Sequence, residues 1–402
     1  MVERVQISKG FKDSEVGGLP VDWSVNNIVD NSTMKARIGW QGLTVAEYLE
    51  KGDYFLITGT DFADGRIKWD TCHYVEKNRY SQDKNIQIKP NDILITKDGT
   101  IGKIAYVDKL SLPATLNSGV FVIRPKDNSY LPLYLFYIFN SLYFNDFLNK
   151  LVAGSTITHL YQKDFTSFKF PLPPTIEEQK AIATALSDTD ELISKLEKLI
   201  AKKRAIKQGA MQELLKPKEE WRIKTLDELI ICMDNLRVPL NEIQRSLIRG
   251  DYPYCGANGI LDFINEYKID DEVILIAEDG GYFDEYSYRP IAYIMKGKFW
   301  VNNHAHILKA QSNYDQNFIF YSLVHKNIQN YLASGTRAKL NKSEMYRITI
   351  DIPEQKDEQK RISQIFIDMD SEIETLEKKL EKLQNLKQGM MQNLLTGKIR
   401  LI

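Results

Sequence analysis

The feature that most constrains this 402-residue chain is a long internal repeat. Residues Glu177–Leu215 align without a gap on Asp357–Leu395 at a constant offset of 180, and 18 of the 39 paired positions are identical. A repeat of this kind dictates the architecture before any single motif does, because equivalent sequences fold into equivalent elements. We therefore expect two copies of one structural plan within the chain.

The repeat continues upstream of both segments, with a looser match further from them. The paired positions are Leu160 with Leu340, Pro173 with Pro353, Asp98-Gly99 with Asp279-Gly280, and Trp23 with Trp221. The expected order is variable domain, helix, variable domain, helix. Its boundaries are placed at residues 1–175, 176–216, 217–354 and 355–402.

Each variable domain is predicted to be an α/β (α+β) globular domain. Short runs rich in β-branched and aromatic residues indicate strands, and one longer apolar stretch in each domain indicates a helix. In the first domain these segments are 92–96, 103–107, 119–125, 131–148 and 168–173. In the second they are 272–278, 292–297, 305–309, 317–333 and 347–353.

The two repeated segments show the apolar spacing of a coiled coil. Apolar residues step by three and four, which is the pattern of a heptad seam. The seam residues are Ile182, Leu186, Thr189, Ile193, Leu196 and Ile200 in the first segment, and Ile362, Phe366, Met369, Ile373, Leu376, Leu380 and Leu383 in the second. Thr175 with Glu178 predicts a capping box, Pro217 ends the first helix, and each helix should run about 38 residues, or about 57 Å.

Charge predicts how the two helices pair. The first half of each segment is acidic, as at Asp188 and Asp190, and the second half is basic, as at Lys203 and Lys207. Antiparallel packing places each acidic half beside a basic half and also suits the helix dipoles. We expect an antiparallel pair, which relates the two domains by a pseudo-two-fold axis.

At this point the chain resembles the specificity subunits of type I restriction-modification systems over nearly its whole length. The stretches that carry the resemblance are Phe168–Leu186, Asp351–Ser363, the two KQGxMQ segments, the terminal NLLTGKIRL, GLPVDW and WVNNHAHIL. One departure is that the second spacer begins with PEQKDEQ where the first has PPTIEEQ, so its helix cap is less obvious and its starting residue is blurred.

The resemblance implies a non-catalytic subunit that binds double-stranded DNA. Each of two target-recognition domains would read one half of a split sequence, and the helices would set the spacing and dock two methyltransferase subunits. Restriction subunits join in the full complex. The resemblance places S-adenosylmethionine, ATP and magnesium on those partners, with no cofactor in this chain and no membrane partner.

Candidate DNA contacts lie in polar loops, because phosphates need Lys, Arg, hydroxyl or amide donors and base edges are read best by Arg, Lys, Asn and Gln. In the first domain they are Lys35, Arg37, Trp40, Gln41, Lys97, Thr100, Lys103, Ser155, Thr156, Thr158, His159 and Lys163. In the second they are Asn258, Asn302, Asn303, His304, His306, Thr336, Arg337, Lys339, Asn341 and Lys342. For any one residue, a solvated loop side chain is an equally good interpretation.

Two other functions fit parts of the sequence. Asp251–Cys255 is superficially similar to the Asp/Asn-Pro-Pro-aromatic motif of DNA adenine methyltransferases, but Tyr252 replaces the first proline and no cofactor-binding glycine cluster precedes it. A coiled-coil scaffold that binds only protein would explain the helices and leave two elaborate domains unexplained. Methyl transfer by the chain alone would establish the first alternative, and DNA binding with its partners would exclude the second.

Composition adds little that is specific. The net charge of -1 neither supports nor excludes DNA, because binding depends on local charge. Cys72, Cys232 and Cys255 are widely spaced and are interpreted as reduced, packed thiols. His304 and His306 alternate on a strand, but no further ligands follow at metal-site spacing. Polar residues interrupt the apolar stretch at 131–148, so we expect a cytoplasmic protein.

Overall fold

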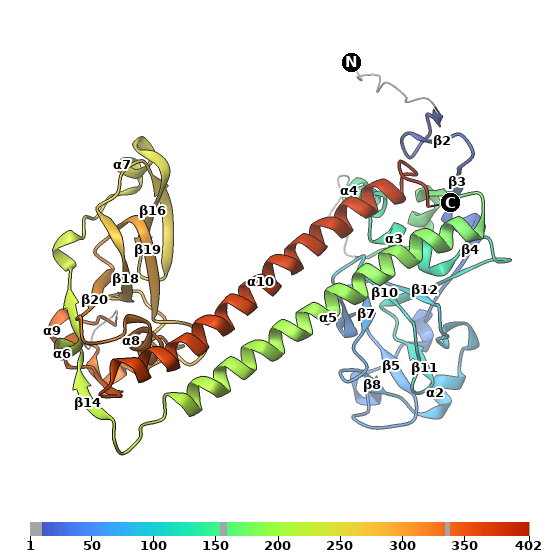
Figure 1. Cartoon of the computed structure of the whole chain (residues 1–402). Coiled ribbons are helices and arrows are strands. Elements are labelled where there is room, and N and C mark those ends of the chain that lie inside the picture. Colours follow the sequence, from blue (N-terminus) through green and yellow to red (C-terminus); the bar gives the residue numbers. More distant parts are fainter. Residues whose placement is uncertain (1–9, 153–158, 334–337, 402) are drawn as a thin grey trace. The chain divides into compact units, whose positions relative to one another are not determined.

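The structure is a computed structural model that describes residues 10–152, 159–333 and 338–401 (Figure 1). The chain forms two compact units. Unit 1 comprises Met1–Leu196 together with Lys379–Ile402, and unit 2 comprises Glu197–Lys378. The two long helices are therefore shared between the units, and each unit contains a globular domain with part of both helices.

Unit 1 contains a mixed set of short strands and helices. Its strands are β1 (Phe11–Lys12), β2 (Leu19–Pro20), β3 (Ser24–Asn27), β4 (Ser32–Ala36), β5 (Phe55–Ile57), β6 (Phe62–Ala63), β7 (Arg66–Ile67), β8 (His73–Tyr74), β9 (Ile93–Thr96), β10 (Ile104–Tyr106), β11 (Ala114–Leu116), β12 (Val120–Pro125) and β13 (Lys169–Leu172). Its helices are α1 (Ile28–Asn31), α2 (Lys77–Ser81), α3 (Pro132–Phe139), α4 (Leu142–Val152), the first part of α5 (Ile176–Leu214) and the last part of α10 (Lys356–Leu394).

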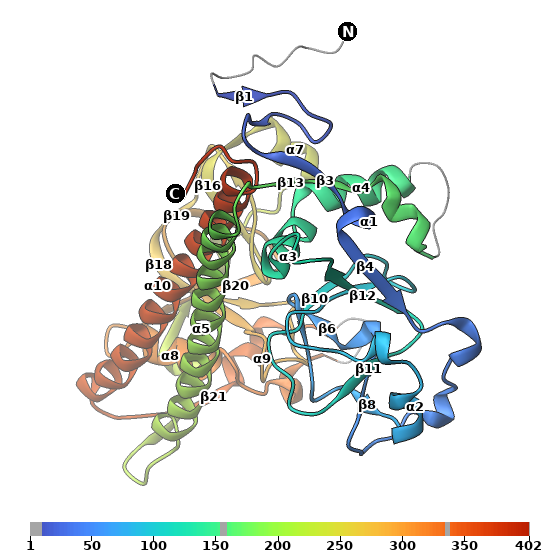
Figure 2. The ribbon, with the colours of Figure 1, turned by 90° about the vertical axis from the view of Figure 1, so that its right-hand side faces the viewer.

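The central sheet of unit 1 has the antiparallel order β10-β9-β12-β4 and is covered on both faces. Ile93 and Ile95 pack with the aromatic residues of α3, whereas Leu94 points to the opposite face and packs with Phe55 and Ile57 of the three-stranded sheet β11-β5-β8. Figure 2 shows α3 beside this sheet and β11 and β8 beyond it. Burial on both faces explains why the strand is a continuous apolar run.

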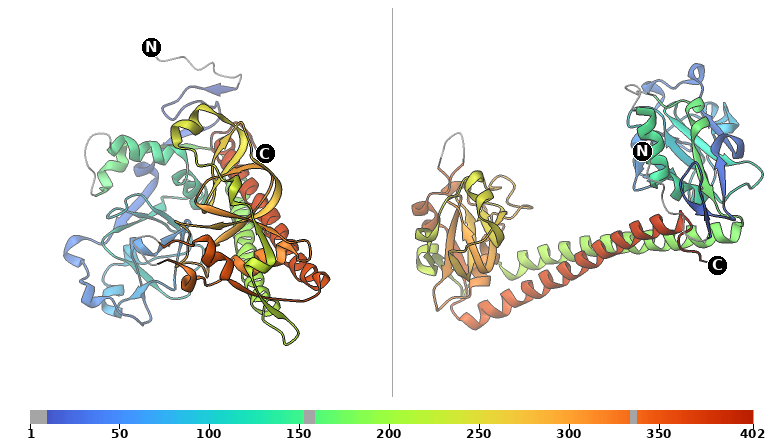
Figure 3. Two further views of the ribbon diagram at one scale, coloured as in Figure 1. Left: turned by 90° about the vertical axis from the view of Figure 1, so that its left-hand side faces the viewer. Right: turned by 90° about the horizontal axis from the view of Figure 1, so that it is seen from above.

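Unit 2 is built around a six-stranded sheet of order β15-β20-β18-β19-β16-β17, drawn in yellow and orange in Figure 3. The strands of unit 2 are β14 (Arg222–Thr225), β15 (Ile230–Cys232), β16 (Arg249–Gly256), β17 (Gly259–Ile264), β18 (Ile269–Ala277), β19 (Ala292–Val301), β20 (Ala305–Ala310) and β21 (Thr349–Ile352), of which β14 and β21 pair separately from the six-stranded sheet. Its helices are α6 (Leu226–Leu229), α7 (Glu242–Leu247), α8 (Gln316–Leu323), α9 (Lys342–Arg347), the last part of α5 and the first part of α10 (Lys356–Leu394).

The two units share one frame of elements. In unit 1, β3, α1 and β4 lead to β9, β12, α3, β13 and α5, and in unit 2, β14, α6 and β15 lead to β18, β20, α8, β21 and α10. The strand pairings β13·β3 and β14·β21 correspond, as do β12·β9 and β20·β18. The internal repeat therefore extends to the topology of both domains, including regions where the sequence match is weak.

The long helices have the expected length and direction. Each has 39 residues, close to the predicted 38. In unit 1, Thr189 contacts Met390 and Asp190 pairs with Lys387, and in unit 2, Lys203 pairs with Glu372 and Lys207 pairs with Asp370. In each unit a later residue of α5 meets an earlier residue of α10, so the two helices run antiparallel. Among the described residues, every predicted seam position is buried or partly buried. No described helix is long and apolar enough to cross a bilayer.

A Tyr–Asp–Lys cluster attaches each domain to the helix pair. In unit 1, the Tyr137 hydroxyl donates to Asp190 at 2.8 Å, and Lys387 Nζ lies 2.5 Å from the other oxygen of that carboxylate. In unit 2, the Tyr321 hydroxyl donates to Asp370 at 2.7 Å, and Lys207 pairs with the same carboxylate. The repeat thus preserves a contact between the domain and both helices.

The glutamine of each EQK segment joins the start of a long helix to its domain. Gln179 accepts from the backbone N–H of Leu131 at 2.8 Å, and its amide donates to the carbonyl of Pro173 at 3.3 Å. Gln359 makes the corresponding bonds, to Asp315 N and Pro353 O, both at 2.8 Å. Both glutamine residues are buried, which gives the repeated motif a structural reason.

We expect Gln359→Leu to reduce the free energy of unfolding of unit 2 by about 2–3 kcal/mol, because it removes two hydrogen bonds at a buried position. Urea denaturation of the purified chain, monitored by hydrogen exchange in unit 2, measures this loss. Gln364→Leu on the same helix is the matched control, because Gln364 is exposed and should change stability by no more than about 0.5 kcal/mol. Equal effects of the two substitutions would contradict the assigned role.

Candidate nucleic-acid interface

Two polar loops of unit 1 meet at the end of β9. The N–H of Leu160 donates to the carbonyl of Lys97 at 2.8 Å, and Asp98 forms an isolated bridge with His159. The side chains of Asp98 and His159 also form an ion pair. The structure therefore brings together the loop from Lys97 to Lys103 and the segment that begins at His159.

The loop after β9 is tightly held at its base. Thr96 Oγ1 donates to the carbonyl of Thr100 at 2.5 Å and accepts from the N–H of Lys103 at 2.9 Å. Gly102 has a φ of +81°, and a Cβ atom there would lie 2.5 Å from Leu148 Cδ1, so glycine is required. This fixed base leaves Thr100 and Lys103 exposed at its surface.

Unit 2 has the same arrangement with different side chains. The N–H of Leu340 donates to the carbonyl of Glu278 at 2.7 Å, and Asp279 forms a bridge with Lys339. His304 Nδ1 lies 2.7 Å from Asp279 Oδ1. The Asn258 amide joins this group by donating to the carbonyl of Gly280 at 2.9 Å. The candidate loops of the second domain thus converge as those of the first do.

Most of the described candidates are available to a partner. The exposed ones are Lys35, Thr100, Lys103, Lys163, Asn258, Asn303, Lys339, Asn341 and Lys342, and the partly exposed ones are Lys97, His159 and His304. The exposed group contains amide and lysine side chains, which are types that contact base edges and phosphates. Their roles in DNA contact stay predictions.

The family model for the type I restriction modification DNA specificity domain matches this chain twice, at residues 39–208 and 218–385. The chain belongs to this family. Each copy of the specificity domain combines most of one globular domain with a large part of the helix that follows it. These matches favour neither the methyltransferase nor the scaffold alternative.

Relatives agree over short and long spans. A Haemophilus influenzae protein, provisionally named a type I restriction enzyme specificity subunit, is 37% identical over 145 residues, which is 36% of either chain. The type I restriction enzyme MjaVIII specificity subunit of Methanocaldococcus jannaschii is 26% identical, with coverage of 100% of this chain and 99% of that one. A solved S subunit from M. genitalium has a TM-score of 0.65 at 18% identity, covering 92% and 96% of the two chains, and supports the fold.

Four candidates in the specificity domains are buried, which argues against their direct contact with DNA. Arg37 is 1% exposed, and its guanidinium donates to the carbonyl of Leu116 at 2.8 Å. Burial lowers the pKa of Arg37. Asn302 accepts from the N–H of His304, and Gln41 and His306 are buried as well. The residue type alone could not distinguish these buried side chains from exposed ones.

Several candidates lie outside the described part of the specificity domains. They are Ser155, Thr156, Thr158, Thr336 and Arg337, together with the side chain of Trp40. Their prediction as DNA contacts is unchanged.

The polar loops that meet at the end of β9 in unit 1 and after β18 in unit 2 are called the loop clusters below. The sequence interpretation missed the acidic residues of both. Asp98 and Asp279 pair with His159 and His304, and a carboxylate in such a place can accept a hydrogen bond from cytosine. The Asp-Gly pair that repeats at Asp98-Gly99 and Asp279-Gly280 was the signal, because an equivalent polar turn in both specificity domains marks an equivalent place in the fold.

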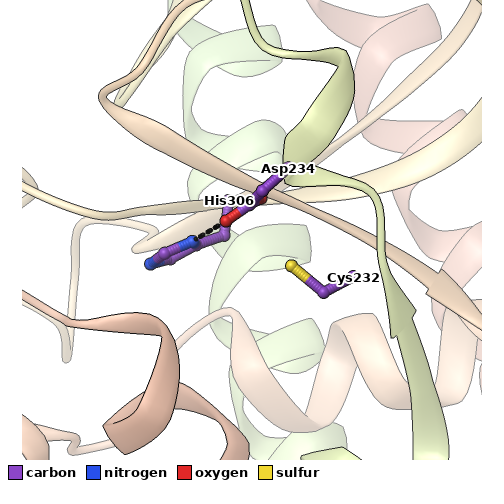
Figure 4. Close-up of side chains that lie close together, drawn as sticks. All are labelled: Cys232, Asp234 and His306. Carbon is purple, nitrogen blue, oxygen red and sulfur yellow. Dashed lines mark hydrogen bonds and ion pairs between the residues drawn. The ribbon is translucent and has the colours of Figure 1, made fainter.

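One cluster of the second specificity domain has the residue types of a metal site. Donor atoms of Cys232, Asp234 and His306 lie within 4.8 Å of one another (Figure 4). Both ring nitrogens of His306 are already hydrogen bonded, and the cationic Arg237 lies 3.1 Å from Asp234. This geometry fits a hydrogen-bonded network better than a cation site.

The three cysteines are free thiols. Burial raises the pKa of Cys72 and of Cys255 to about 12 and also raises that of Cys232. We expect Cys72 and Cys255 to be inert to Ellman's reagent at pH 8 in the native chain, because both are buried and their raised pKa keeps the thiols protonated. The unfolded chain should release three equivalents, and rapid release of all three from the native chain would contradict the prediction.

Proposed function

We propose that this chain is the DNA-reading specificity subunit of a type I restriction-modification complex and that each unit reads one half of a bipartite target. The observation that carries the proposal is the twofold match to the DNA specificity domain, with one loop cluster in each unit. Two similar but unequal readers suit a target whose halves differ in sequence.

The exposed side chains of the loop clusters suit the two tasks of a DNA reader. Lysine residues such as Lys103 and Lys342 contact phosphates, which fixes the register of the protein on the duplex. Amides such as Asn258 and Asn303 can make paired hydrogen bonds to an adenine edge in the major groove. Exposed cations and amides on rigid bases therefore support sequence-specific contact.

The helix pair sets the spacing between the two halves of the target in this proposal. A helix of 39 residues is about 58 Å long. Half-sites one helical turn apart are separated by about 34–36 Å, so the helices have the length needed to leave intervening base pairs unread.

The helices also dock the methyltransferase subunits, two in number. Leu192, Leu199 and Ile206 are exposed on α5 at intervals of seven residues, which places them on one face of the helix. An exposed apolar stripe of this kind suits a partner helix. A solved chain whose study concerns assembly of the type I restriction-modification system matches with a TM-score of 0.53.

Catalysis resides in the partner subunits in this proposal. The methyltransferase subunits bind S-adenosylmethionine, and the restriction subunits of the full complex bind ATP and magnesium. This chain determines the DNA sequence at which they act.

The test is to express the chain with its methyltransferase subunit and to map methylated adenines across the genome by single-molecule sequencing. We expect a split motif with a fixed gap that disappears when the chain is deleted. Exchange of residues 1–175 for those of a relative should alter one half of the motif, and the matched exchange of residues 217–354 should alter the other. Methylation that is unchanged by deletion would overturn the proposal.

A further inference from the structure

A buried histidine lies at the centre of the loop cluster of unit 2. His306 of β20 is 1% exposed. Its Nδ1 lies 2.7 Å from Asp234 Oδ2, and its Nε2 lies 2.8 Å from the carbonyl oxygen of Leu340. A carbonyl can only accept, and the carboxylate is the acceptor on the other side when ionised. The geometry therefore fits an imidazolium that donates from both nitrogens.

The same network extends to the neighbouring loops through Arg237. Its guanidinium pairs with Asp234 at 3.1 Å and with Glu278, and it donates to the carbonyl of Ala305 at 3.3 Å. Glu278 in turn lies 2.9 Å from Lys339 Nζ. Four segments are thereby joined: the turn at 234–237, Glu278 directly after β18, the start of β20, and residues 339–340.

The cations of this network stabilise the ionised form of its two carboxylates. Burial raises the pKa of Asp234, but the hydrogen bond from His306 and the N–H of Ile307 outweigh it, so the pKa lies below its ordinary value. Burial likewise raises the pKa of Glu278, and the bonds from Arg237 and Lys339 reverse that shift. Both carboxylates are therefore ionised at neutral pH and hold the cations in place.

Unit 1 has the same backbone arrangement without this network. Phe121 pairs with Ala36 and Ile95, just as His306 lies between Asp234 and Ile276. Lys97, which follows β9 as Glu278 follows β18, places its ammonium 5.2 Å from the Phe121 ring centre. A phenylalanine thus serves the fold at this position, so the polar group of unit 2 is not needed to form the sheet.

We propose that His306 is a positioning residue that holds the DNA-reading loops of unit 2 in register, and this inference rests on the function proposed above. It makes no base contact itself. By joining Asp234 to the Leu340 carbonyl, it fixes the segments that carry Asn303, His304 and Lys339. Loss of the hydrogen bonds of His306 should lower the sequence specificity of unit 2 and leave the sequence specificity of unit 1 unchanged.

The experiment compares purified complexes of the chain with its methyltransferase subunits on duplexes that carry one mismatched base pair in either half of the motif. His306→Phe introduces the residue that unit 1 has at the equivalent position. His306→Gln keeps one hydrogen bond but cannot span both acceptors. His325→Phe is the matched control, because that histidine is exposed and its side chain hydrogen bonds to the carbonyl of Tyr286, outside the network of His306. Thermal unfolding of each complex is recorded in parallel.

We expect discrimination against mismatches in the unit 2 half to fall about tenfold with His306→Phe, which is the scale of one lost specific contact. His306→Gln should cause a smaller loss, and His325→Phe none. The inference would be overturned if both assembled His306 variants discriminated against mismatches as well as the wild type does. This holds even if their melting temperature falls, because a loss of stability alone shows only a structural role. If His306→Phe does not assemble, His306→Gln decides the question in the same way. A wild-type complex with no split motif would instead refute the proposed function.

Discussion

Replacing Arg400 with alanine is expected to reduce the free energy of unfolding of unit 1 by about 3–5 kcal/mol. The side chain of Glu178 is fully buried, and Arg400 holds its carboxylate through two nitrogen atoms. Removal of the guanidinium leaves an uncompensated buried charge at the start of α5. Urea denaturation monitored by hydrogen exchange in unit 1 measures the loss.

The double variant Arg400→Ala/Glu178→Gln is the control for this effect. It removes both charges, so most of the lost stability should return. Asp22→Asn should cost less than about 1 kcal/mol, because the carboxylate of Asp22 is 47% exposed. The hydrogen bond from Arg400 lowers the pKa of Asp22, so this small contribution is present above the ordinary pKa of an aspartate and is lost as pH falls through the lowered value. A cost below about 1 kcal/mol for Arg400→Ala would show that Glu178 finds another partner.

Phe366→Ala is expected to reduce the stability of unit 2 by about 3–5 kcal/mol, because a fully buried aromatic ring leaves a cavity. Phe366 lies on α10 and packs on Tyr321, with ring centres 4.9 Å apart. Tyr321 is also the residue whose hydroxyl binds Asp370. The substitution therefore weakens both the core and the attachment of the domain to the helix pair.

The neighbouring Ile365→Ala is a matched control for Phe366→Ala, since Ile365 is 40% exposed and should change stability by less than about 1 kcal/mol. Leu186→Ala tests the independence of the two cores, because this buried residue belongs to unit 1. Hydrogen exchange should show loss of protection in unit 2 for Phe366→Ala and in unit 1 for Leu186→Ala. Equal loss in both units from either variant would mean that they unfold as one body.

The helices and the division into two similar domains could be predicted from sequence, because each depends on a local and repeated pattern. The spacing of Ile182, Leu186 and Leu196 indicated the seam, and the alternation of acidic and basic halves indicated the antiparallel direction. Strand positions followed from short apolar runs such as Ile93–Thr96. These features need no knowledge of distant contacts, which is why they were predicted correctly.

The long-range polar contacts could not be predicted. Glu178 was expected to complete a capping box, and its N–H does bond Thr175 Oγ1, but its carboxylate instead binds Arg400, 222 residues away. His306 and Arg37 have the residue types of DNA contacts, yet each is buried within its own domain. Whether a polar side chain faces solvent depends on which loop covers it, and that loop is specified elsewhere in the chain.

Unit 1 is discontinuous in sequence, whereas unit 2 is a single segment from Glu197 to Lys378. During synthesis the ribosome makes the whole of unit 2 before it adds Leu394 and Leu395, which pack in the core of unit 1. Domains generally fold as units as they emerge. Unit 1 begins first but can complete its core only last. Its full stability is therefore reached only after translation has passed the end of the second long helix.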